Sequence, residues 1–398
     1  MRTLADLGEL RGKRVLVRVD FNVPLNSGGA DGAVVADDTR IRAALPTIAA
    51  LRERGAALIL VSHLGRPKGP DPALSMAPVA RRLGELLHEP VMLASGTTGP
   101  EVSQQASSLR EGEVLLLENI RFEPGETTND PALAQELAAL AEVYVDDAFG
   151  AAHRAHASTE GVARRIDDRA AGLLLAHEVE VLTSLLSDPA RPFVAVLGGA
   201  KVSDKIGVIQ ALAPLADAIL IGGAMCFPFL KAAHHSVGDS LCADEDVALA
   251  RGLMAGRRLS SEREASLELP VDLVLGDHFG ADATPVPLDG VDVPDGMMGL
   301  DIGPRTAAAY AKQIGAAGTV FWNGPMGAFE LEPFAAQTKT VAEAVAFSAA
   351  ATIVGGGDSA AALVKFGLQD QVTHLSTGGG ASLELIEGKE LPGVEVLR

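Results

Sequence analysis

The sequence predicts an α/β fold of two doubly wound, Rossmann-like parallel-sheet domains, joined by a helix and with a cleft between them. Three observations lead to this prediction. Short β-branched apolar runs alternate with amphipathic helical patterns, which is typical of a parallel sheet with helices on both faces. The alternation occurs in both halves of the chain, and one helical segment lies between the halves. The length of 398 residues fits two domains of roughly 100–200 residues each.

In the N-terminal half, the strand-like runs are short and rich in Val, Leu and Ile. They occupy residues 14–21, 56–64, 90–95, 113–120 and 142–149. Patterns with apolar residues at helical spacing occupy residues 39–55, 76–88 and 130–142. Strand and helix therefore follow one another as in a parallel sheet.

The second half repeats this pattern, and nearly all of its strand-like runs end in glycine. These runs are 193–199, 216–224, 271–277, 318–324, 351–357 and 373–379. The segment 169–192 lies between the halves, and its interior is typical of a helix that stops near Asp188 and Pro189. We therefore expect a connecting helix in this segment and the domain boundary around it.

Composition excludes several classes of function. A formal net charge of −19 disfavours general binding to nucleic acid or to anionic membranes, and an aromatic content of 4% disfavours a base-stacking surface. The first residues contain no apolar core of signal-peptide length, and the apolar stretch before Asp358 is too short to span a bilayer. Only Cys226 and Cys242 occur, which fits a reducing compartment. We therefore expect a cytoplasmic protein.

A basic set of residues follows the predicted strands of the N-terminal half. Converging arginines bind phosphate or carboxylate oxygens bidentately, so together they indicate a site for a small polyanion, although any one of them alone is more often a solvated surface residue. A zinc site at the histidines is disfavoured because their neighbours are arginines. The set is Arg18, Arg40, His63, Arg66, Arg121, His153 and Arg154.

Asp20 and Asn22 follow the first predicted strand. Their side chains could hydrogen-bond a hydroxylated ligand. The sequence Asn22-Val23-Pro24 is equally typical of a turn that ends the strand, so both interpretations stay open.

Glycine-rich turns in the C-terminal half could let backbone amides approach phosphate. Gly198 and Gly199 precede Lys201 and Lys205, but the spacing is not that of a Walker motif, so a tight strand–helix turn is an equally good interpretation. No dinucleotide-binding fingerprint opens a strand–helix–strand unit.

The turn at 355–357 leads to Asp358, which is placed to hold Mg²⁺, and to Ser359, which could cap the next helix. Gly222 and Gly223 could lie against a flat adenine, and Glu330 could accept hydrogen bonds from ribose hydroxyls. For the segment around Trp322 and Glu330, a structural turn is the preferred interpretation from residues alone.

Taken together, these segments make the sequence resemble the phosphoglycerate kinase family over almost its whole length. Single glycine motifs are weak evidence, but the ordered set is highly specific. The segments are RVDFNVP, TRIRAALPTI, SHLGRP, LLENIRF, DAFGAAHRAHAS, LGGAKVSDKI, IGGAM, MMGLDIGP, WNGPMGAFE, GGGDS and STGGGASLE. Asp146 departs from the pattern, because the family commonly has Asn at this position.

The resemblance implies that residues 1–171 bind 3-phosphoglycerate or 1,3-bisphosphoglycerate. Asp20 and Asn22 would hold the hydroxyacid, Arg40 would face the transferring group, and His153 would support the phosphate clamp. That clamp would be His63, Arg66, Arg121 and Arg154, and the full implied substrate set is Asp20, Phe21, Asn22, Arg40, His63, Leu64, Gly65, Arg66, Arg121, His153 and Arg154.

The resemblance further implies a connecting helix at 172–188, a nucleotide-binding domain at 189–375 and a segment 376–398 that returns to the N-terminal domain. ATP or ADP would bind with Mg²⁺ on Asp358, and Arg40, Lys201 and Gly379 would act in catalysis. The implied nucleotide set is Gly199, Lys201, Lys205, Gly222, Gly223, Gly299, Leu300, Asn323, Glu330, Gly356, Gly357, Asp358 and Ser359.

Two alternatives stay open on the residues. One is a different acyl-phosphate or carboxylate kinase, which would share the phosphate-binding turns and differ in the basic set. The other is a non-enzymatic nucleotide-binding protein on the same fold, which predicts loss of Lys201, Arg40 or Asp358, and all three are present. A two-domain kinase of this kind is expected to work as a monomer.

Overall fold

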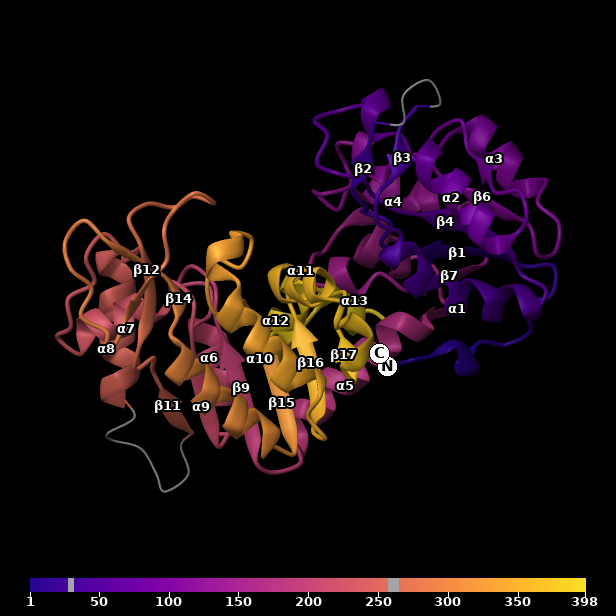
Figure 1. The fold of residues 1–398 in the computed structure, drawn as a ribbon. Coiled ribbons are helices and arrows are strands. Elements are labelled where there is room, and N and C mark those ends of the chain that lie inside the picture. Colours follow the sequence, from indigo (N-terminus) through magenta and orange to yellow (C-terminus); the bar gives the residue numbers. More distant parts are fainter. Residues whose placement is uncertain (28–31, 257–264) are drawn as a thin grey trace. The chain divides into compact units, whose positions relative to one another are not determined.

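The computed structural model describes residues 1–27, 32–256 and 265–398. The chain divides into two compact units: unit 1 is Met1–Glu180 with Glu390–Arg398, and unit 2 is Val181–Lys389. Each unit contains a six-stranded sheet in which every pair of neighbouring strands is parallel (Figure 1). The predicted fold class, α/β with two doubly wound parallel sheets, is therefore confirmed.

The sheet of unit 1 has the strand order β5-β6-β4-β1-β7-β8. Its central strands are apolar on both faces because helices cover both sides, and all five residues of β4 are buried. The short strands β2 (Leu25–Asn26) and β3 (Val34–Val35) pair with each other as an antiparallel ribbon. The sheet strands are β1 (Arg14–Arg18), β4 (Ala57–Val61), β5 (Met92–Leu93), β6 (Val114–Leu116), β7 (Val143–Asp146) and β8 (Arg169–Ala171).

Local sequence sets the ends of the unit 1 helices. In α4 the carboxylate of Asp130 accepts hydrogen bonds from the amides of Ala132 and Leu133, and Pro131 takes the first helical position. The helices are α1 (Thr39–Glu53), α2 (Ala77–Leu87), α3 (Pro100–Ser107), α4 (Pro131–Ala138) and α13 (Pro392–Glu395), with single turns η1 (Leu4–Asp6), η3 (Pro72–Leu74), η4 (Ile120–Phe122), η5 (Phe149–Ala151) and η6 (Ala157–Gly161).

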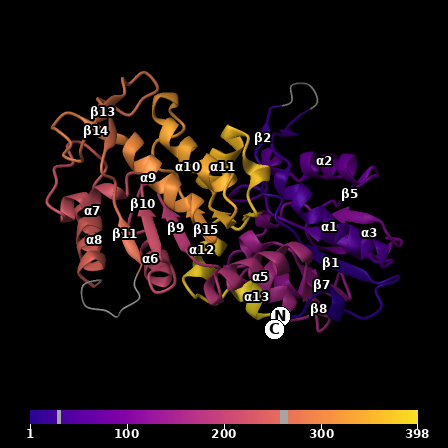
Figure 2. The same cartoon turned by 60° about the horizontal axis from the view of Figure 1, so that its bottom comes forward.

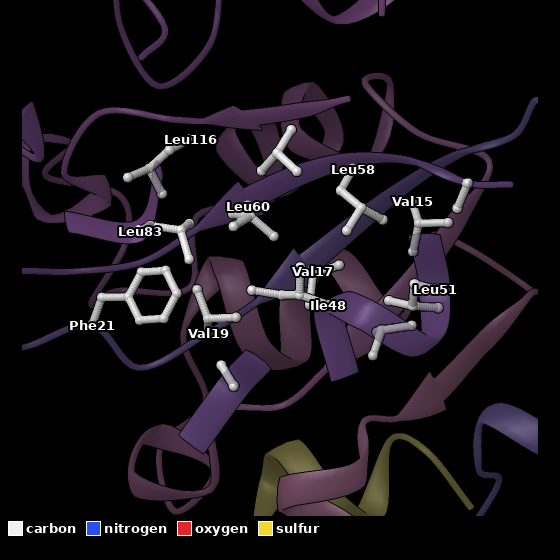
Figure 3. Packing of buried hydrophobic residues seen from close by; sticks show 14 of the residues in the cluster. Val15, Val17, Val19, Phe21, Ile48, Leu51, Leu58, Leu60, Leu83 and Leu116 are labelled. Atoms are coloured by element: carbon white, nitrogen blue, oxygen red, sulfur yellow. The ribbon is translucent and has the colours of Figure 1, made fainter. Parts of the chain in front are cut away.

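The core of unit 1 lies between its sheet and the helices α1 and α2. Figure 3 shows Ile48 and Leu51 of α1 beside Val15 and Val17 of β1, with Leu60 of β4 next to them. All five side chains are fully buried, and each such burial contributes about 1.5–3 kcal/mol. This packing fixes the positions at which β1 and β4 end.

The sheet of unit 2 has the strand order β11-β10-β9-β15-β16-β17. Residues of α9 (Pro304–Gly315) and α10 (Ala336–Ala346) share a buried cluster with β9 and β15. Figure 2 shows these two helices on one side of the strands, and α6 and α12 on the other. The strands are β9 (Phe193–Leu197), β10 (Ala218–Ile221), β11 (Ser266–Glu268), β15 (Thr319–Asn323), β16 (Ala351–Gly355) and β17 (His374–Leu375).

The remaining elements of unit 2 are mostly short. The helices are α6 (Ile206–Leu212), α7 (Cys226–Ala232), α8 (Asp244–Gly256), α11 (Gly357–Phe366) and α12 (Gly380–Ile386), with turns η7 (Glu332–Phe334) and η8 (Gln369–Gln371). Within the part of the chain that the structure describes, no helix has the length and apolarity needed to cross a bilayer.

A second sheet in unit 2 corrects one prediction. The run 271–277 resembles the parallel strands, but β12 (Leu273–Gly276) pairs antiparallel with β13 (Val286–Leu288) and β14 (Met298–Ile302). An apolar run predicts a strand but not the strands with which it pairs, so the sequence pattern alone could not assign β12 to a sheet. The register of β12 against β14 shifts between Val274 and Leu275, as at a β-bulge.

Helix α5 (Leu173–Ser187) occupies the segment in which the sequence predicts a helix, and it crosses from unit 1 into unit 2. The carboxylate of Asp147 accepts hydrogen bonds from the amides of Leu174 (2.9 Å) and Leu175 (3.3 Å), which satisfies donors at the first turn of the helix.

Residues 390–398 pack in unit 1, beside the first residues of the chain. The Arg2 amide donates to the carbonyl of Leu397 (2.7 Å), and the Gly393 amide donates to the carbonyl of Ala152 (2.9 Å). Figure 2 shows the two ends of the chain next to each other.

Candidate functional site

The polar residues of unit 1 gather where its central strands end. Asp20 and Asn22 follow β1, His63 and Arg66 follow β4, and Arg121 lies in η4 after β6. Because β6, β4 and β1 are parallel neighbours, their carboxyl ends lie along one edge, which is where parallel sheets bind ligands. His153 and Arg154 follow η5 after β7, and Arg40 is the second residue of α1.

Hydrogen bonds hold this edge in place. Arg40 Nη1 lies 2.8 Å from Asp20 Oδ2, in a pair whose carboxylate is only 12% exposed. The side-chain oxygen of Asn22 accepts from the amide of Gly65 (2.8 Å), so it ties the loop after β1 to the loop after β4. The side chains of the two predicted apolar site residues, Phe21 and Leu64, are buried in the core.

A cavity of about 300 Å³ opens beside these loops. Arg66, Lys68, Arg121 and Arg154 line it, together with the carboxylate of Glu123. Four cations against one anion suit a polyanionic ligand. The sequence did not single out Lys68, although its place two residues after Arg66 in a Gly-Pro loop was an available signal.

Two arginines of this cavity are already oriented. Arg121 Nη1 donates to the carbonyl of Gly65 (2.6 Å), and Arg154 Nε donates to His153 Nε2 (3.0 Å). Burial, followed by the charge of Arg18, lowers the pKa of Arg121 below its ordinary value. The charges of Arg154 and Arg66 act on Arg121 in the same direction. A bound anion would offset this concentration of positive charge.

Arg18 differs from the expectation. Its side chain is only 1% exposed and lies beneath the edge, so it is not a solvent-facing anion ligand. Arg18 Nε donates to Ser158 Oγ (2.8 Å), and Ser158 Oγ donates to Glu126 Oε1 (2.6 Å). The sequence reasoning missed Glu126 and Ser158, because an isolated Glu and Ser in polar loops carry no local signal of burial.

In unit 2 the predicted residues also follow strand ends. Gly199, Lys201 and Lys205 come after β9, Gly222 and Gly223 after β10, and Asn323 ends β15. Gly356, Gly357, Asp358 and Ser359 come after β16, and Gly379 comes after β17. The strands β10, β9, β15, β16 and β17 are successive neighbours, so these turns share the carboxyl edge of the second sheet.

Several of these glycines permit close backbone packing. A Cβ at Gly198 would lie 2.0 Å from the carbonyl oxygen of Pro325, and one at Gly222 would lie 2.5 Å from Met326 Sδ. Gly223 has a φ of +64° and sits against the backbone of Gly199. The turns after β9, β10 and β15 thus pack closely, and glycine at Gly198 and Gly222 leaves room for the Pro325 carbonyl and the Met326 side chain.

A second cavity, of about 520 Å³, adjoins these turns, and most of its wall is apolar. The side chains of this wall that were not predicted are Phe227, Leu241, Phe279 and Met298. Met298 directly precedes the predicted Gly299 in the segment MMGLDIGP, whereas the other three occur outside the motifs. Phe279 is 65% exposed, so a flat aromatic ligand would cover it. The predicted residues that line the cavity are Gly199, Gly223, Gly299, Leu300, Glu330 and Asp358.

Asn323 organises the polar end of the edge. Its side-chain oxygen accepts from Lys205 Nζ, and its Nδ2 donates to the carbonyl of Gly355 (2.7 Å). Burial lowers the pKa of Lys205, although the carboxylates of Asp204, Asp358 and Glu387 act in the opposite direction. Lys201 is exposed, so its charge is available to a ligand.

The expectation that Ser359 caps the helix is wrong. Ser359 lies inside α11, and Gly356 holds the N-cap position with a φ of +93°. Ser359 Oγ instead accepts a hydrogen bond from the amide of Gly324 (2.6 Å), which joins the turns after β15 and β16.

Asp358 could take part in a magnesium site. It is exposed in the first turn of α11 and lines the larger cavity. Among the described residues, no three His, Cys, Asp or Glu side chains gather in a way that could hold a metal by themselves. Mg²⁺ commonly binds through one or two carboxylates, substrate phosphates and water, so a single carboxylate fits a metal carried by a nucleotide.

Comparison with known proteins gives consistent matches over the whole chain. A model of the family described as Phosphoglycerate kinase matches residues 4–389. Among curated relatives, the phosphoglycerate kinase of Rubrobacter xylanophilus is 57% identical over 399 residues, covering 100% of this chain and 98% of the relative. That of Moorella thermoacetica is 55% identical, covering 99% and 98%.

Solved structures agree with these matches. The structure of phosphoglycerate kinase from Coxiella burnetii has a TM-score of 0.87 at 41% identity, covering 99% of this chain and 98% of that one. The structure from Pyrococcus horikoshii has a TM-score of 0.84 at 33% identity, covering 100% and 98%.

Proposed function

Because the chain belongs to the phosphoglycerate kinase family, we propose that its two units each carry one substrate of a single phosphoryl transfer. The chain is a kinase that transfers a phosphoryl group reversibly between ATP and the carboxyl group of 3-phosphoglycerate, as in glycolysis. Its substrate-binding residues lie at the carboxyl edges of the two parallel sheets.

Unit 1 takes the three-carbon acid. Arg66, Arg121 and Arg154 bind the phosphate that stays on the substrate, with His63 and His153 beside them. Asp20 and Asn22 hold the hydroxyl and carboxyl end, and Arg40 faces the group that moves. The single observation that carries this assignment is the 300 Å³ cavity, since its four cationic side chains stand out in a chain with a net charge of −19.

Unit 2 takes the nucleotide. The apolar cavity accepts the adenine between Phe227 and Leu300, while Glu330 accepts from the ribose hydroxyls. Lys201, Lys205, Asn323 and the turns at 356–359 and 377–379 lie toward the phosphates. Asp358 would hold the Mg²⁺ that accompanies them, and that ion would neutralise part of the phosphate charge when bound.

No general base is needed for the reaction. In the ATP-forming direction an ionised oxygen of the ADP β-phosphate forms a bond to the acyl phosphate phosphorus, and the carboxylate oxygen leaves with the bonding electron pair. No proton moves, so the protein contributes position and positive charge. Lys201 and Arg40 supply that charge at the transferring group. Transfer requires the two substrates to meet, so we propose that the chain closes when both are bound.

The assay of the forward or reverse reaction tests this assignment. Purified protein is incubated with 3-phosphoglycerate, ATP and Mg²⁺, and formation of the bisphosphate is coupled to NADH oxidation. We expect turnover that depends on Mg²⁺ and falls by about 10²–10³ in Lys201→Ala, the range for one stabilising group at a developing charge. A folded native protein that binds nucleotide without turnover would contradict the proposal and favour another acceptor.

The same assay with other carboxylic acids distinguishes the remaining alternative, a kinase for a different small anion.

We further propose that the protein acts in the cytoplasm as a monomer. Its cysteines, Cys226 and Cys242, are free, which supports a reducing compartment. Sedimentation at two protein concentrations tests the oligomeric state.

A further inference from the structure

A buried layer of ionisable side chains lies directly beneath the anion-binding edge of unit 1. Arg18 ends β1 and pairs in register with Val61 of β4, two residues before His63. Arg18 is 1% exposed and His63 is 6% exposed. Arg18 Nη2 lies 3.1 Å from His63 Nδ1. The two groups therefore meet where water does not compete for their hydrogen bonds.

The chemistry of the two groups fixes where the imidazole hydrogen sits. A guanidinium carries only donors, so Arg18 can only donate at this contact. His63 Nδ1 must then be the acceptor, and the ring hydrogen must be on Nε2. A doubly protonated, positively charged ring would point a second N–H at the Arg18 guanidinium, and the repulsion between the two cations opposes that state.

Contacts on its other side prevent the Arg18 guanidinium from turning away. Nη1 donates to the carbonyl of Val19, and Nε donates to Ser158 Oγ (2.8 Å). The Ser158 hydroxyl donates onward to Glu126 Oε1 (2.6 Å), while the Ser158 amide donates to Glu126 Oε2 (3.0 Å). Every donor and acceptor in this chain has one consistent direction, from Arg18 to Glu126.

Glu126 is the counter-charge that lets a buried arginine remain charged. It is fully buried, and His156 Nδ1 lies 3.6 Å from its Oε1. Burial alone would raise the pKa of Glu126, but the hydrogen bonds of His156 and Ser158 and the charge of Arg18 bring it below its ordinary value. Glu126 is therefore ionised at neutral pH and balances Arg18 through Ser158.

We propose that Arg18 is a positioning residue that locks His63 as a neutral ring with its hydrogen on Nε2, so that this N–H is the donor offered to the substrate anion. The inference rests on the proposed function, in which His63 lies beside the arginines that bind the substrate phosphate. In this proposal Ser158 and Glu126 hold the Arg18 side chain in place. The proposal also gives a reason for a buried arginine beneath the exposed ones.

The charges around His63 favour the same neutral state. Burial first, and then the charges of Arg18, Arg121, Arg40 and His156, lower the pKa of His63 well below its ordinary value. The ring thus stays neutral through the range in which an ordinary histidine, with a pKa of about 6.5, titrates.

The test uses the native full-length chain with ¹⁵N-labelled histidine. Imidazole ¹⁵N shifts distinguish the two neutral tautomers and the charged ring, and the spectrum of His63→Gln identifies the His63 signals. We expect the Nε2–H tautomer, unchanged between about pH 6 and 8. A hydrogen on Nδ1, or a titration inside that range, overturns the proposal without any variant having to fold.

Two variants then separate charge from geometry. In Arg18→Met, which loses the donor and the charge, the pKa of His63 should rise and the tautomers should mix. In Arg18→Lys, which keeps the charge, the pKa of His63 should stay low while the tautomer preference weakens. Arg14→Met is the matched control, since Arg14 lies on the same strand and pairs with Glu142. His63 signals that are unchanged in folded Arg18→Met would reduce Arg18 to a structural role and overturn the proposal.

Kinetics give the functional measure. We expect the KM for 3-phosphoglycerate to rise about tenfold in Arg18→Met, with kcat less affected, because one oriented donor to an anion is lost. If the native protein turns over 3-phosphoglycerate but KM is unchanged in Arg18→Met, this inference fails and the proposed function stands. If the native protein shows no turnover, the proposed function fails, and the tautomer of His63 is still read from the spectrum.

Discussion

The carboxyl edges of the two parallel sheets, which we propose bind the anionic substrates, are built in opposite ways. The edge of unit 1 is built from charged side chains, and a further buried set of charges lies beneath it. The edge of unit 2 is built largely from glycine turns, and at Gly198, Gly222 and Gly223 the surrounding atoms leave no room for a side chain. One edge presents charged side chains, and the other presents glycine turns and an apolar wall.

The two sheets differ in strand order, but in both the polar and glycine-rich segments follow the carboxyl ends of parallel strands. A carboxyl edge of parallel strands therefore does not by itself determine how such a site is built. The difference between the edges also predicts different sensitivities. Unit 1 should respond to changes of charge, pH and salt, because its key contacts are electrostatic. Unit 2 should respond to the addition of even one methyl group at Gly198 or Gly222, because neighbouring atoms already occupy that space.

The largest expected effect is a loss of stability when side-chain volume is added in unit 2. In Gly198→Ala, the new methyl group would meet the Pro325 oxygen at 2.0 Å and the Gly324 oxygen at 2.8 Å, both on the backbone. We expect unit 2 to lose at least about 3 kcal/mol of stability, the upper end of the usual cost of overpacking. Chemical denaturation followed by Trp322, which is buried in unit 2, measures it.

Gly252→Ala is the matched control for that experiment. Gly252 lies in α8 with nothing within 4 Å of its Cβ position. The same substitution should therefore stabilise the helix by about 0.5–1 kcal/mol. Equal destabilisation by both substitutions would refute the comparison of tight and open glycines.

The next effect concerns buried charge in unit 1. Burial raises the pKa of Asp146 from 3.8 to about 6. A carboxyl that keeps its proton longer in the folded state stabilises the protein below its unfolded pKa, and this contribution is lost as the pH rises through 6. A shift of about two pKa units corresponds to roughly 3 kcal/mol as an upper limit.

Asp146→Asn should therefore increase the stability of unit 1 at pH 8 by up to that amount and leave it nearly unchanged at pH 3.5. Denaturant midpoints measured from pH 3.5 to pH 8 give the result. Asp167→Asn is the control, because Asp167 is exposed. An Asp146→Asn profile parallel to that of the native protein would show that burial does not shift this carboxyl.

The smallest expected effect is on substrate affinity, when an arginine that lines the cavity of unit 1 is replaced by lysine. Arg121→Lys keeps the charge and loses the forked geometry, including the donation to the Gly65 carbonyl. We expect the KM for 3-phosphoglycerate to rise about tenfold with little change in kcat, which corresponds to about 1.4 kcal/mol.

Arg110→Lys is its control, since Arg110 is exposed and pairs with Glu113 three residues later. Steady-state kinetics at two ionic strengths measure both variants. If Arg121→Lys behaves like Arg110→Lys, net charge alone explains recognition in unit 1.

Much of the fold could be predicted from the sequence, because local pattern carries it. The apolar runs at 14–21 and 193–199 contain β1 and β9, and the glycines and charged residues that follow them mark the strand ends. Most of the predicted substrate and nucleotide residues fall after successive strands for the same reason, whereas Arg40 lies in α1 and Gly299 and Leu300 lie within β14. Topology then gathers the edges, since parallel neighbours end on the same side.

What the sequence could not supply are relations between distant segments. The partners of β12 are β13 and β14, and nothing in its apolar run distinguishes antiparallel from parallel pairing. The chain from Arg18 to Glu126 joins positions that are 140 and 32 residues apart, through Ser158. Glu126 and Ser158 belong to no motif in their own segments, and only the packed structure joins them to Arg18.

The placement of residues 390–398 has a consequence for biosynthesis. These residues pack against the beginning of unit 1 but follow unit 2 along the chain, so the ribosome makes them after the whole of unit 2. The first 180 residues therefore emerge without a part of their own core, including Leu391, Val394 and Leu397. Unit 1 is completed only after translation has passed unit 2, and during that interval its unfinished surface is open to chaperones.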